Sequence, residues 1–214
     1  MLLQITFVGL AVLAFMLFYF GTGKNAKVFV FGTLWIVISG LMSYSGFFQK
    51  TNVLPPRMIF ILLPVVVLAV ITYKKLNIID VKPGYLIALH ILRIPIELTL
   101  YQLFLKGKIP ILMTFRGWNY DILIGISAIA IWGYYTLIPK RLNMIVFRAW
   151  NILGLLFLLS IVSIAILSAP SPIQLLAFDT PNLALITFPY TLLPAVIVPI
   201  VLLSHLLCLK RRLP

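Results

Sequence analysis

Apolar runs long enough to cross a lipid bilayer follow one another along almost the whole chain. A membrane-spanning helix needs about 20 residues, within a range of about 17–25. Seven runs meet that requirement, at about 2–20, 28–48, 55–73, 84–105, 118–138, 144–168 and 185–209. Short links with glycine and proline, such as Pro55-Pro56, separate them. The sequence therefore predicts an all-α fold, a polytopic transmembrane bundle of about seven spanning helices, in one integral membrane domain over residues 1–214.

Composition excludes the soluble classes of protein. Of the 214 residues, 63% are hydrophobic and 10% are charged, whereas roughly a quarter of the residues in a soluble domain are charged. A water-soluble fold of this length cannot bury so much apolar surface. The net charge of +13 comes from short groups of basic residues between the apolar runs, where they face lipid headgroups. We therefore expect membrane lipids as partners and no nucleic acid.

The basic residues predict the orientation, because lysine and arginine gather on the cytoplasmic side of membrane proteins. If the seven runs alternate in direction, 11 basic residues fall on one side and 5 on the other. The richer side holds Lys24, Lys27, Lys74, Lys75, Lys82, Lys140, Arg141, Arg148, Lys210, Arg211 and Arg212. We thus expect the N-terminus outside, the C-terminus in the cytoplasm, and a multi-pass protein of a bacterial or archaeal cytoplasmic membrane.

The fourth apolar run carries ionisable residues through its middle. His90, Arg93, Glu97 and Tyr101 are spaced by three, four and four residues, which places them on nearly one face of a helix. Charged groups inside a membrane need partners and commonly mark a functional site. We therefore predict that this stripe faces protein neighbours.

Two interpretations of Arg93 and Glu97 remain open. They lie one helical turn apart, so an ion pair within the helix is sterically easy and could serve packing alone. Alternatively, they line a site that binds a ligand or handles protons. Pro95 lies between them and frees the Ile91 carbonyl as an acceptor for Arg93.

Two histidines, His90 and His205, lie at similar depths in the fourth and last runs. Facing histidines on separate helices can hold a b-type haem, which makes haem an alternative cofactor. Arg148 and Asn151 share a helix face. With the two histidines they would form a basic pocket near the inner leaflet, suited to a phosphate, a carboxylate or a lipid headgroup. Otherwise, Arg148 extends to the membrane surface.

Asn119 and Asp121, at the start of the fifth run, are interpreted as helix caps beside the interfacial aromatics Trp118 and Tyr120. The single cysteine, Cys208, allows no intrachain disulfide, and we interpret it as a packing residue. No catalytic motif and no dedicated metal-binding motif is found in the sequence.

The leading hypothesis is a small membrane protein that binds, translocates or senses a small molecule, an ion or a proton. Its polar site would comprise His90, Arg93, Glu97, Tyr101, Arg148, Asn151 and His205. The ligand would be a small molecule or a lipid, and an oligomer or a partner subunit is compatible with the sequence. The alternatives are a redox protein with haem between His90 and His205, and a structural or accessory subunit.

Overall fold

The computed structural model describes residues 1–138 and 142–211, and within those ranges it is all-α, without strands. Its α-helices are α1 (Leu2–Gly21), α2 (Ala26–Tyr44), α3 (Ile59–Lys75), α4 (Pro83–Ile91), α5 (Arg93–Leu105), α6 (Asp121–Leu137), α7 (Met144–Leu167) and α8 (Val198–Lys210). Short 3₁₀ turns occupy Phe47–Gln49, Ile111–Met113 and Ala184–Ile186, and a π-helical turn, η4, occupies Leu193–Ile197. The prediction of an all-α helical bundle is confirmed.

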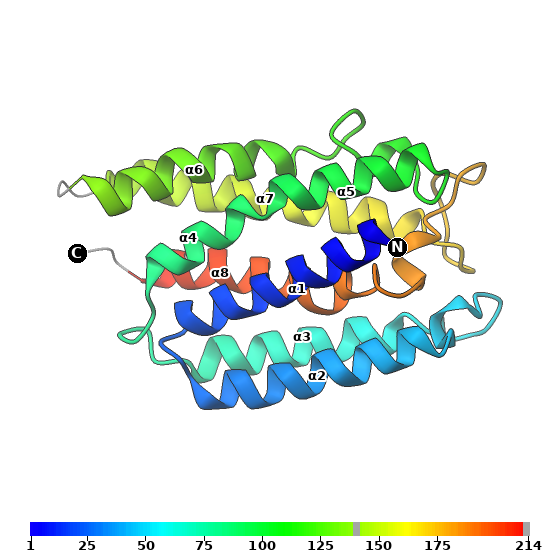
Figure 1. The fold of residues 1–214 in the computed structure, drawn as a ribbon, viewed down its shortest axis with the longest axis horizontal. Helices are drawn as coiled ribbons and strands as arrows, with labels where there is room; N and C mark the ends of the chain where they lie inside the picture. The colour runs from blue at the N-terminus through cyan, green and yellow to red at the C-terminus, as the bar shows by residue number, and fades with distance from the viewer. Residues whose placement is uncertain (139–141, 212–214) are drawn as a thin grey trace.

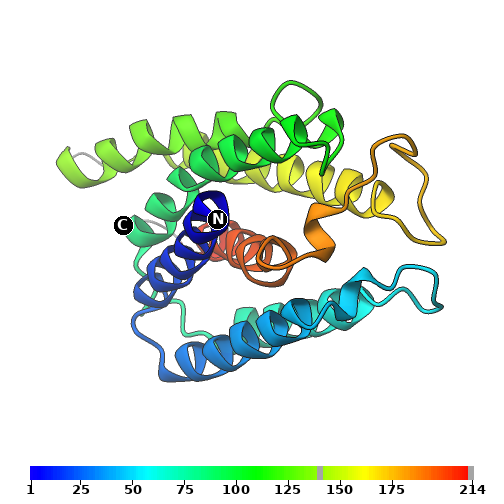
Figure 2. The same cartoon turned by 45° about the vertical axis from the view of Figure 1, so that its right-hand side comes forward.

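The helices lie side by side along the long axis of the molecule, in three tiers (Figures 1 and 2). Helices α5, α6 and α7 form one tier, α1 and α8 lie in the middle, and α2 and α3 form the opposite tier. Successive helical crossings of the bundle, which we call passes, run in alternate directions; the last pass comprises η4 and α8. The N-terminus and the end of α8 therefore lie at opposite ends of the bundle (Figure 1). The middle tier thus separates the α2–α3 pair from the helices that carry the ionisable stripe.

In the part of the chain that the structure describes, five helical segments are long and apolar enough to cross a membrane: Leu2–Gly21, Ala26–Tyr44, Pro83–Leu105, Met144–Leu167 and Leu193–Lys210. Helices α3 and α6 have 17 residues each, so seven crossings remain a prediction, as does the orientation. Lys140, Arg141 and Arg212, which contribute to the charge asymmetry, lie outside the described residues.

Several predicted helix boundaries are wrong, for identifiable local reasons. Helix α2 ends at Tyr44, before the left-handed Gly46, rather than at residue 48. Helix α3 begins at Ile59 rather than at 55, after Pro55 and Pro56. Helix α6 begins at Asp121 rather than at 118, and the last helical segment begins at Leu193 rather than at 185. In each case, an apolar run extends beyond the residues that can form a helix.

Prolines interrupt two of the passes. Pro95 lacks a backbone N–H, and the helix is broken between α4 and α5 at Leu92, whose N–H bonds to Leu89 at 3.1 Å in a tighter turn. In the last pass, Pro199 lies four residues after Ala195, so the usual helical donor for the Ala195 carbonyl is missing. The indole Nε1 of Trp35 donates to that carbonyl at 2.9 Å and so ties α2 to the last pass.

The link between α5 and α6 returns along α5 without being an α-helix. Asp121, the first residue of α6, lies level with Arg93, because their side chains are in contact. Helix α5 continues for 12 residues beyond Arg93, about 18 Å at 1.5 Å per residue. Residues 106–120 cover that distance. Within this link, the backbone carbonyl of Lys108 accepts hydrogen bonds from the backbone N–H groups of Leu183 and Ala184, at 3.0 Å each. Irregular backbone inside a membrane must be covered by other parts of the protein. This link is covered in that way, because Ile109, Met113 and Asn119 are buried.

The Trp35 contact predicts a measurable loss of stability. Trp35→Phe keeps an aromatic ring but leaves the Ala195 carbonyl without a donor, at a cost of about 1–3 kcal/mol. We expect a lower midpoint of thermal unfolding for the purified protein. The control is Trp132→Phe, because Trp132 is 39% exposed on α6 and should change the midpoint little. Equal midpoints for the two variants would contradict the role of Trp35.

Candidate functional site

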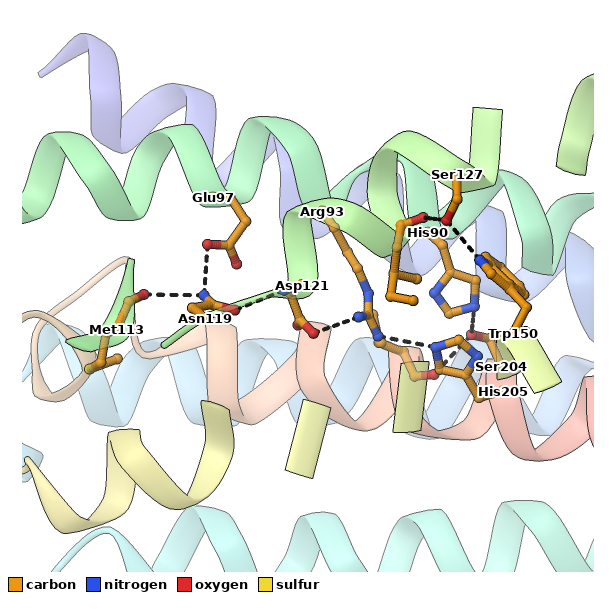
Figure 3. A network of polar contacts seen from close by, with 12 residues as sticks. His90, Arg93, Glu97, Met113, Asn119, Asp121, Ser127, Trp150, Ser204 and His205 are labelled. Carbon is orange, nitrogen blue, oxygen red and sulfur yellow. Dashed lines mark hydrogen bonds and ion pairs between the residues drawn. The ribbon is translucent and has the colours of Figure 1, made fainter. Parts of the chain in front are cut away.

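A buried ion pair lies at the centre of the bundle. Arg93 Nη1 donates to Asp121 Oδ1 at 2.7 Å, and the two residues are 3% and 6% exposed. Arg93 is ten residues from Pro83 and 12 from Leu105, so it lies near the middle of its pass, about 15 Å from the end at Pro83. Figure 3 shows this pair between Glu97 and Asn119 on one side and the two histidines on the other.

Glu97 does not pair with Arg93, contrary to one interpretation of the sequence. Its Oε2 accepts from Asn119 Nδ2 at 2.7 Å, and the same amide group donates to the Met113 carbonyl at 3.1 Å. Asn119 Oδ1 accepts from the backbone N–H of Asp121 at 3.1 Å. Asn119 therefore satisfies an amide at the start of α6, as expected, and also fixes the Glu97 carboxyl beside the ion pair (Figure 3).

Arg93 also contacts His205, and this fixes the tautomer of that histidine. Arg93 Nη2 lies 3.1 Å from His205 Nε2, and a guanidinium has only donors, so Nε2 must accept. The proton of neutral His205 is then on Nδ1, which donates to Asn151 Oδ1 at 2.9 Å, while Asn151 Nδ2 donates to the Phe147 carbonyl at 2.8 Å. Arg93 does not bond to the Ile91 carbonyl, because Asp121 of α6 and His205 of α8 supply its acceptors.

His90 packs directly on His205. The ring centroids are 3.9 Å apart and the planes differ by 25°, with Trp150 edge-on to both rings. His90 Nε2 lies 2.8 Å from Ser204 Oγ. Because the rings are in contact and three of their four nitrogens bond to other side chains, no porphyrin fits between them as haem requires. The histidine pair does not fit the axial ligation of a haem.

Two glycines allow the helices that hold the network to approach closely. A Cβ at Gly125 on α6 would lie 3.2 Å from Arg93 Cβ and 2.9 Å from Ile94 Cγ1. A Cβ at Gly154 on α7 would overlap the ring of His205. Small residues commonly allow helices in membrane proteins to approach closely, and here the two glycines leave space for the side chains of the polar network.

The carboxyl end of the network borders a cavity of about 500 Å³, which we call the outer cavity. It lies between α3 and α7 and against the last pass, and its walls are mainly apolar, as at Leu62, Leu158 and Val162. Arg93, Glu97 and Asp121 are the ionisable residues deep in its lining, while Lys50 and Arg57 line it from the link before α3. Two carboxyl groups and the Arg93 guanidinium thus line the cavity on the α5–α6 side, and Lys50 and Arg57 line it at the link before α3.

The structure places the predicted site residues unequally. His90, Arg93, Glu97, Asn151 and His205 are buried close together. Tyr101 lies outside this cluster, where its hydroxyl accepts from the exposed Arg116 at 2.8 Å. Arg148 is exposed and takes no part in the described hydrogen bonds of the cluster, so the predicted pocket of Arg148, Asn151 and the two histidines is wrong; Arg93 supplies the cation instead.

Asp121, Asn119 and Ser204 belong to the network, although the sequence interpretation left them outside the site. Asp121 and Asn119 had been assigned to capping alone. The signal that points to Asp121 is its place as the first residue of an apolar helix of only 17 residues, since a short helix begins deeper in the bundle. Ser204 is adjacent to His205, and nothing in its pattern distinguishes it from a packing residue.

No family model, no curated protein and no solved structure matches this chain. The arrangement of its own side chains therefore carries the functional argument. Among the described residues, no group of three or more His, Cys, Asp or Glu side chains lies close enough together to hold a metal ion.

The buried ion pair predicts a strongly non-additive pair of substitutions. Asp121→Leu or Arg93→Leu alone leaves one buried charge without its partner, at a cost of about 3–5 kcal/mol. The double variant Arg93→Leu/Asp121→Leu should recover much of that loss, because both charges are removed. Unfolding by a graded increase in denaturing detergent would measure the three free energies. Additive losses would show that the two side chains do not pair.

Proposed function

We propose that the protein binds a small amphipathic molecule with a cationic group in the outer cavity, as a transporter or a sensor in the membrane. The observation that carries the proposal is the placement of the Glu97 and Asp121 carboxyls and the Arg93 guanidinium in the lining of one apolar cavity. Binding pockets for small molecules are commonly of this kind, largely apolar with a few convergent polar groups.

The charges favour a cationic group over an anionic one. Arg93 is already engaged by Asp121 and His205. Of the other two cations in the lining, Arg57 donates to the Phe47 carbonyl and Lys50 is exposed. Glu97 itself is bonded to a neutral amide. An ionised Glu97 in an apolar environment needs a compensating positive charge. A cationic ligand group supplies it, and a proton on Glu97 competes with that group for the same carboxyl.

The apolar walls support a ligand that also has a hydrophobic part. The cavity is bounded by Leu62 and Val66 of α3 and by Leu158 and Val162 of α7. Since both helices lie on the periphery of the bundle (Figure 2), a ligand dissolved in the membrane would reach the cavity between them. The cationic group would contact Glu97 while the apolar part lies along α3 and α7.

A structural role for the network alone is the competing interpretation, and two buried nitrogens argue against it. Arg93 Nε and His90 Nδ1 have no hydrogen-bond partner among the described residues. A network selected only for packing gains little from buried polar atoms that stay unpaired, because each costs about 1–3 kcal/mol. A ligand, an ordered water or a catalytic role can account for such groups.

Binding of the lipophilic cation tetraphenylphosphonium to the purified protein tests the proposal. We expect saturable binding at one site by equilibrium dialysis, with an affinity that rises with pH as protons leave Glu97. Glu97→Gln retains an acceptor for Asn119 but removes the charge, so the affinity should fall at least about tenfold, equivalent to about 1.4 kcal/mol. Its pH dependence should largely disappear.

Tyr101→Phe is the matched control, because Tyr101 lies one turn beyond Glu97 and outside the cavity lining. It should bind the cation as the unmodified protein does. Binding that does not saturate, or that is equal in the Glu97→Gln variant, would refute the proposed site and leave the structural role.

A further inference from the structure

A second cavity of about 760 Å³, which we call the inner cavity, lies at the opposite end of α3. It is enclosed by α1, α2, α3 and the last pass, with Phe18, Trp35, Leu68 and Leu203 among its apolar walls. Asn25, Lys27 and Lys75 also line it, at the first turn of α2 and the last turn of α3. The polar groups are thus confined to one end of an apolar space.

The side of α2 that borders this cavity has little protein cover. The buried residues of α2 are Ser39 and Ser43, both in the half that lies away from Lys27. Trp35 donates to Ala195 at 2.9 Å in the lining of the cavity, and Ser43 Oγ donates to Thr191 at 2.7 Å beyond it. Both contacts hold α2 at the end of the cavity away from Lys27. Of residues 26–34, the inner cavity is lined by Ala26, Lys27, Val28, Phe31 and Gly32. None of residues 26–34 is fully buried, although Phe29 stacks on Phe15 of α1.

The cavity has the depth of one membrane leaflet. Its lining runs along α3 from Lys75 to Val65 and along α2 from Lys27 to Ile36. Along the helix axis these stretches span ten and nine residue steps, about 14–15 Å at 1.5 Å per residue. Half of the roughly 30 Å hydrocarbon core of a bilayer is the same length. An acyl chain of a single leaflet therefore fits the cavity from the membrane surface to the midplane.

The basic residues at the end of the inner cavity near Lys27 and Lys75 favour a lipid with an anionic headgroup. Lys27 and Lys75 are exposed, and Lys24 and Lys74 are exposed beside them. The same end of the bundle also holds Lys82, Lys210 and Arg211. Among the described residues at this end, Asp80 is the acidic one. Basic residues at a membrane surface attract anionic lipids, each by about 1 kcal/mol.

We propose that the inner cavity is a binding site for an anionic phospholipid, with one acyl chain between α2 and α3 and the phosphate at Lys27 and Lys75. The lipid completes the packing of the α2–α3 pair against the middle tier. The two cavities adjoin at Val65 and Pro199, which line both, whereas Lys27 and Lys75 line the inner cavity alone. The proposal is independent of the function proposed for Glu97.

Native mass spectrometry of the detergent-purified protein, titrated with lipid, tests this site. Phosphatidylglycerol and phosphatidylcholine with identical acyl chains are compared. We expect one molecule of phosphatidylglycerol to bind in preference to phosphatidylcholine. Lys27→Gln/Lys75→Gln should weaken binding of phosphatidylglycerol at least about tenfold.

Two matched controls separate a built site from general charge attraction. Lys24→Gln/Lys74→Gln removes the same charge at neighbouring positions outside the lining and should bind nearly as the unmodified protein does. Leu68→Trp fills the cavity and should also weaken binding, whereas Val67→Trp, on the lipid-exposed side of α3, should not. Thermal unfolding establishes that each variant is folded.

Equal binding of the two lipids would overturn the proposal. So would equal losses in the two double-lysine variants, which would indicate attraction by the whole basic surface. Retained phosphatidylglycerol binding in Leu68→Trp would place the lipid elsewhere.

Discussion

The ion pair between Arg93 and Asp121 is the interaction on which the rest of the structure depends. Both charges are buried among helices, and each would destabilise the bundle severely if it lost the other. The pair therefore determines which face of α5 points into the bundle and at what depth in the bundle α6 begins. His205 and Asn151 extend the contact to α8 and α7, so four helical passes are fixed relative to one side chain.

This requirement explains features that would otherwise appear unrelated. Gly125 and Gly154 remove the side chains that would keep α6 from Arg93 and α7 from His205. The depth of Asp121 makes residues 106–120 return along α5 as irregular backbone, which brings Asn119 to Glu97. The same link leaves the Glu97 carboxyl in the lining of the outer cavity. Burial of the ion pair and its neighbours thus places polar side chains against an apolar space. The α2–α3 pair takes no part in the network, and its loose packing is what leaves room for the two cavities.

The sequence predicted the helical class, most helix positions and the inward face of His90, Arg93 and Glu97, because apolar length and helical periodicity are local signals. It could not predict the partner of Arg93. Glu97 was the nearest carboxyl along the chain, but the helix break at Leu92 and the depth of α6 are tertiary properties. Arg148 was misassigned because its spacing to Asn151 defines a shared helix face only approximately, and the face of α7 that turns inward depends on Gly154. The facing histidines were anticipated from depth alone, whereas their direct stacking, which leaves no space for haem, required the packing of α8.

The most direct test is a solid-state NMR distance measurement between Arg93 and Asp121 in the protein reconstituted in lipid bilayers. Labelling of the guanidinium nitrogens with ¹⁵N and of the aspartate carboxyl with ¹³C allows the dipolar coupling of this pair to be measured, with Asp121→Asn/Arg93→Gln as the background. The account predicts strong dephasing, consistent with the 2.7 Å contact between nitrogen and oxygen, and its loss in the background variant. No coupling above that background would contradict the account, because Arg93 would then have another partner and the depth of α6 would be unexplained.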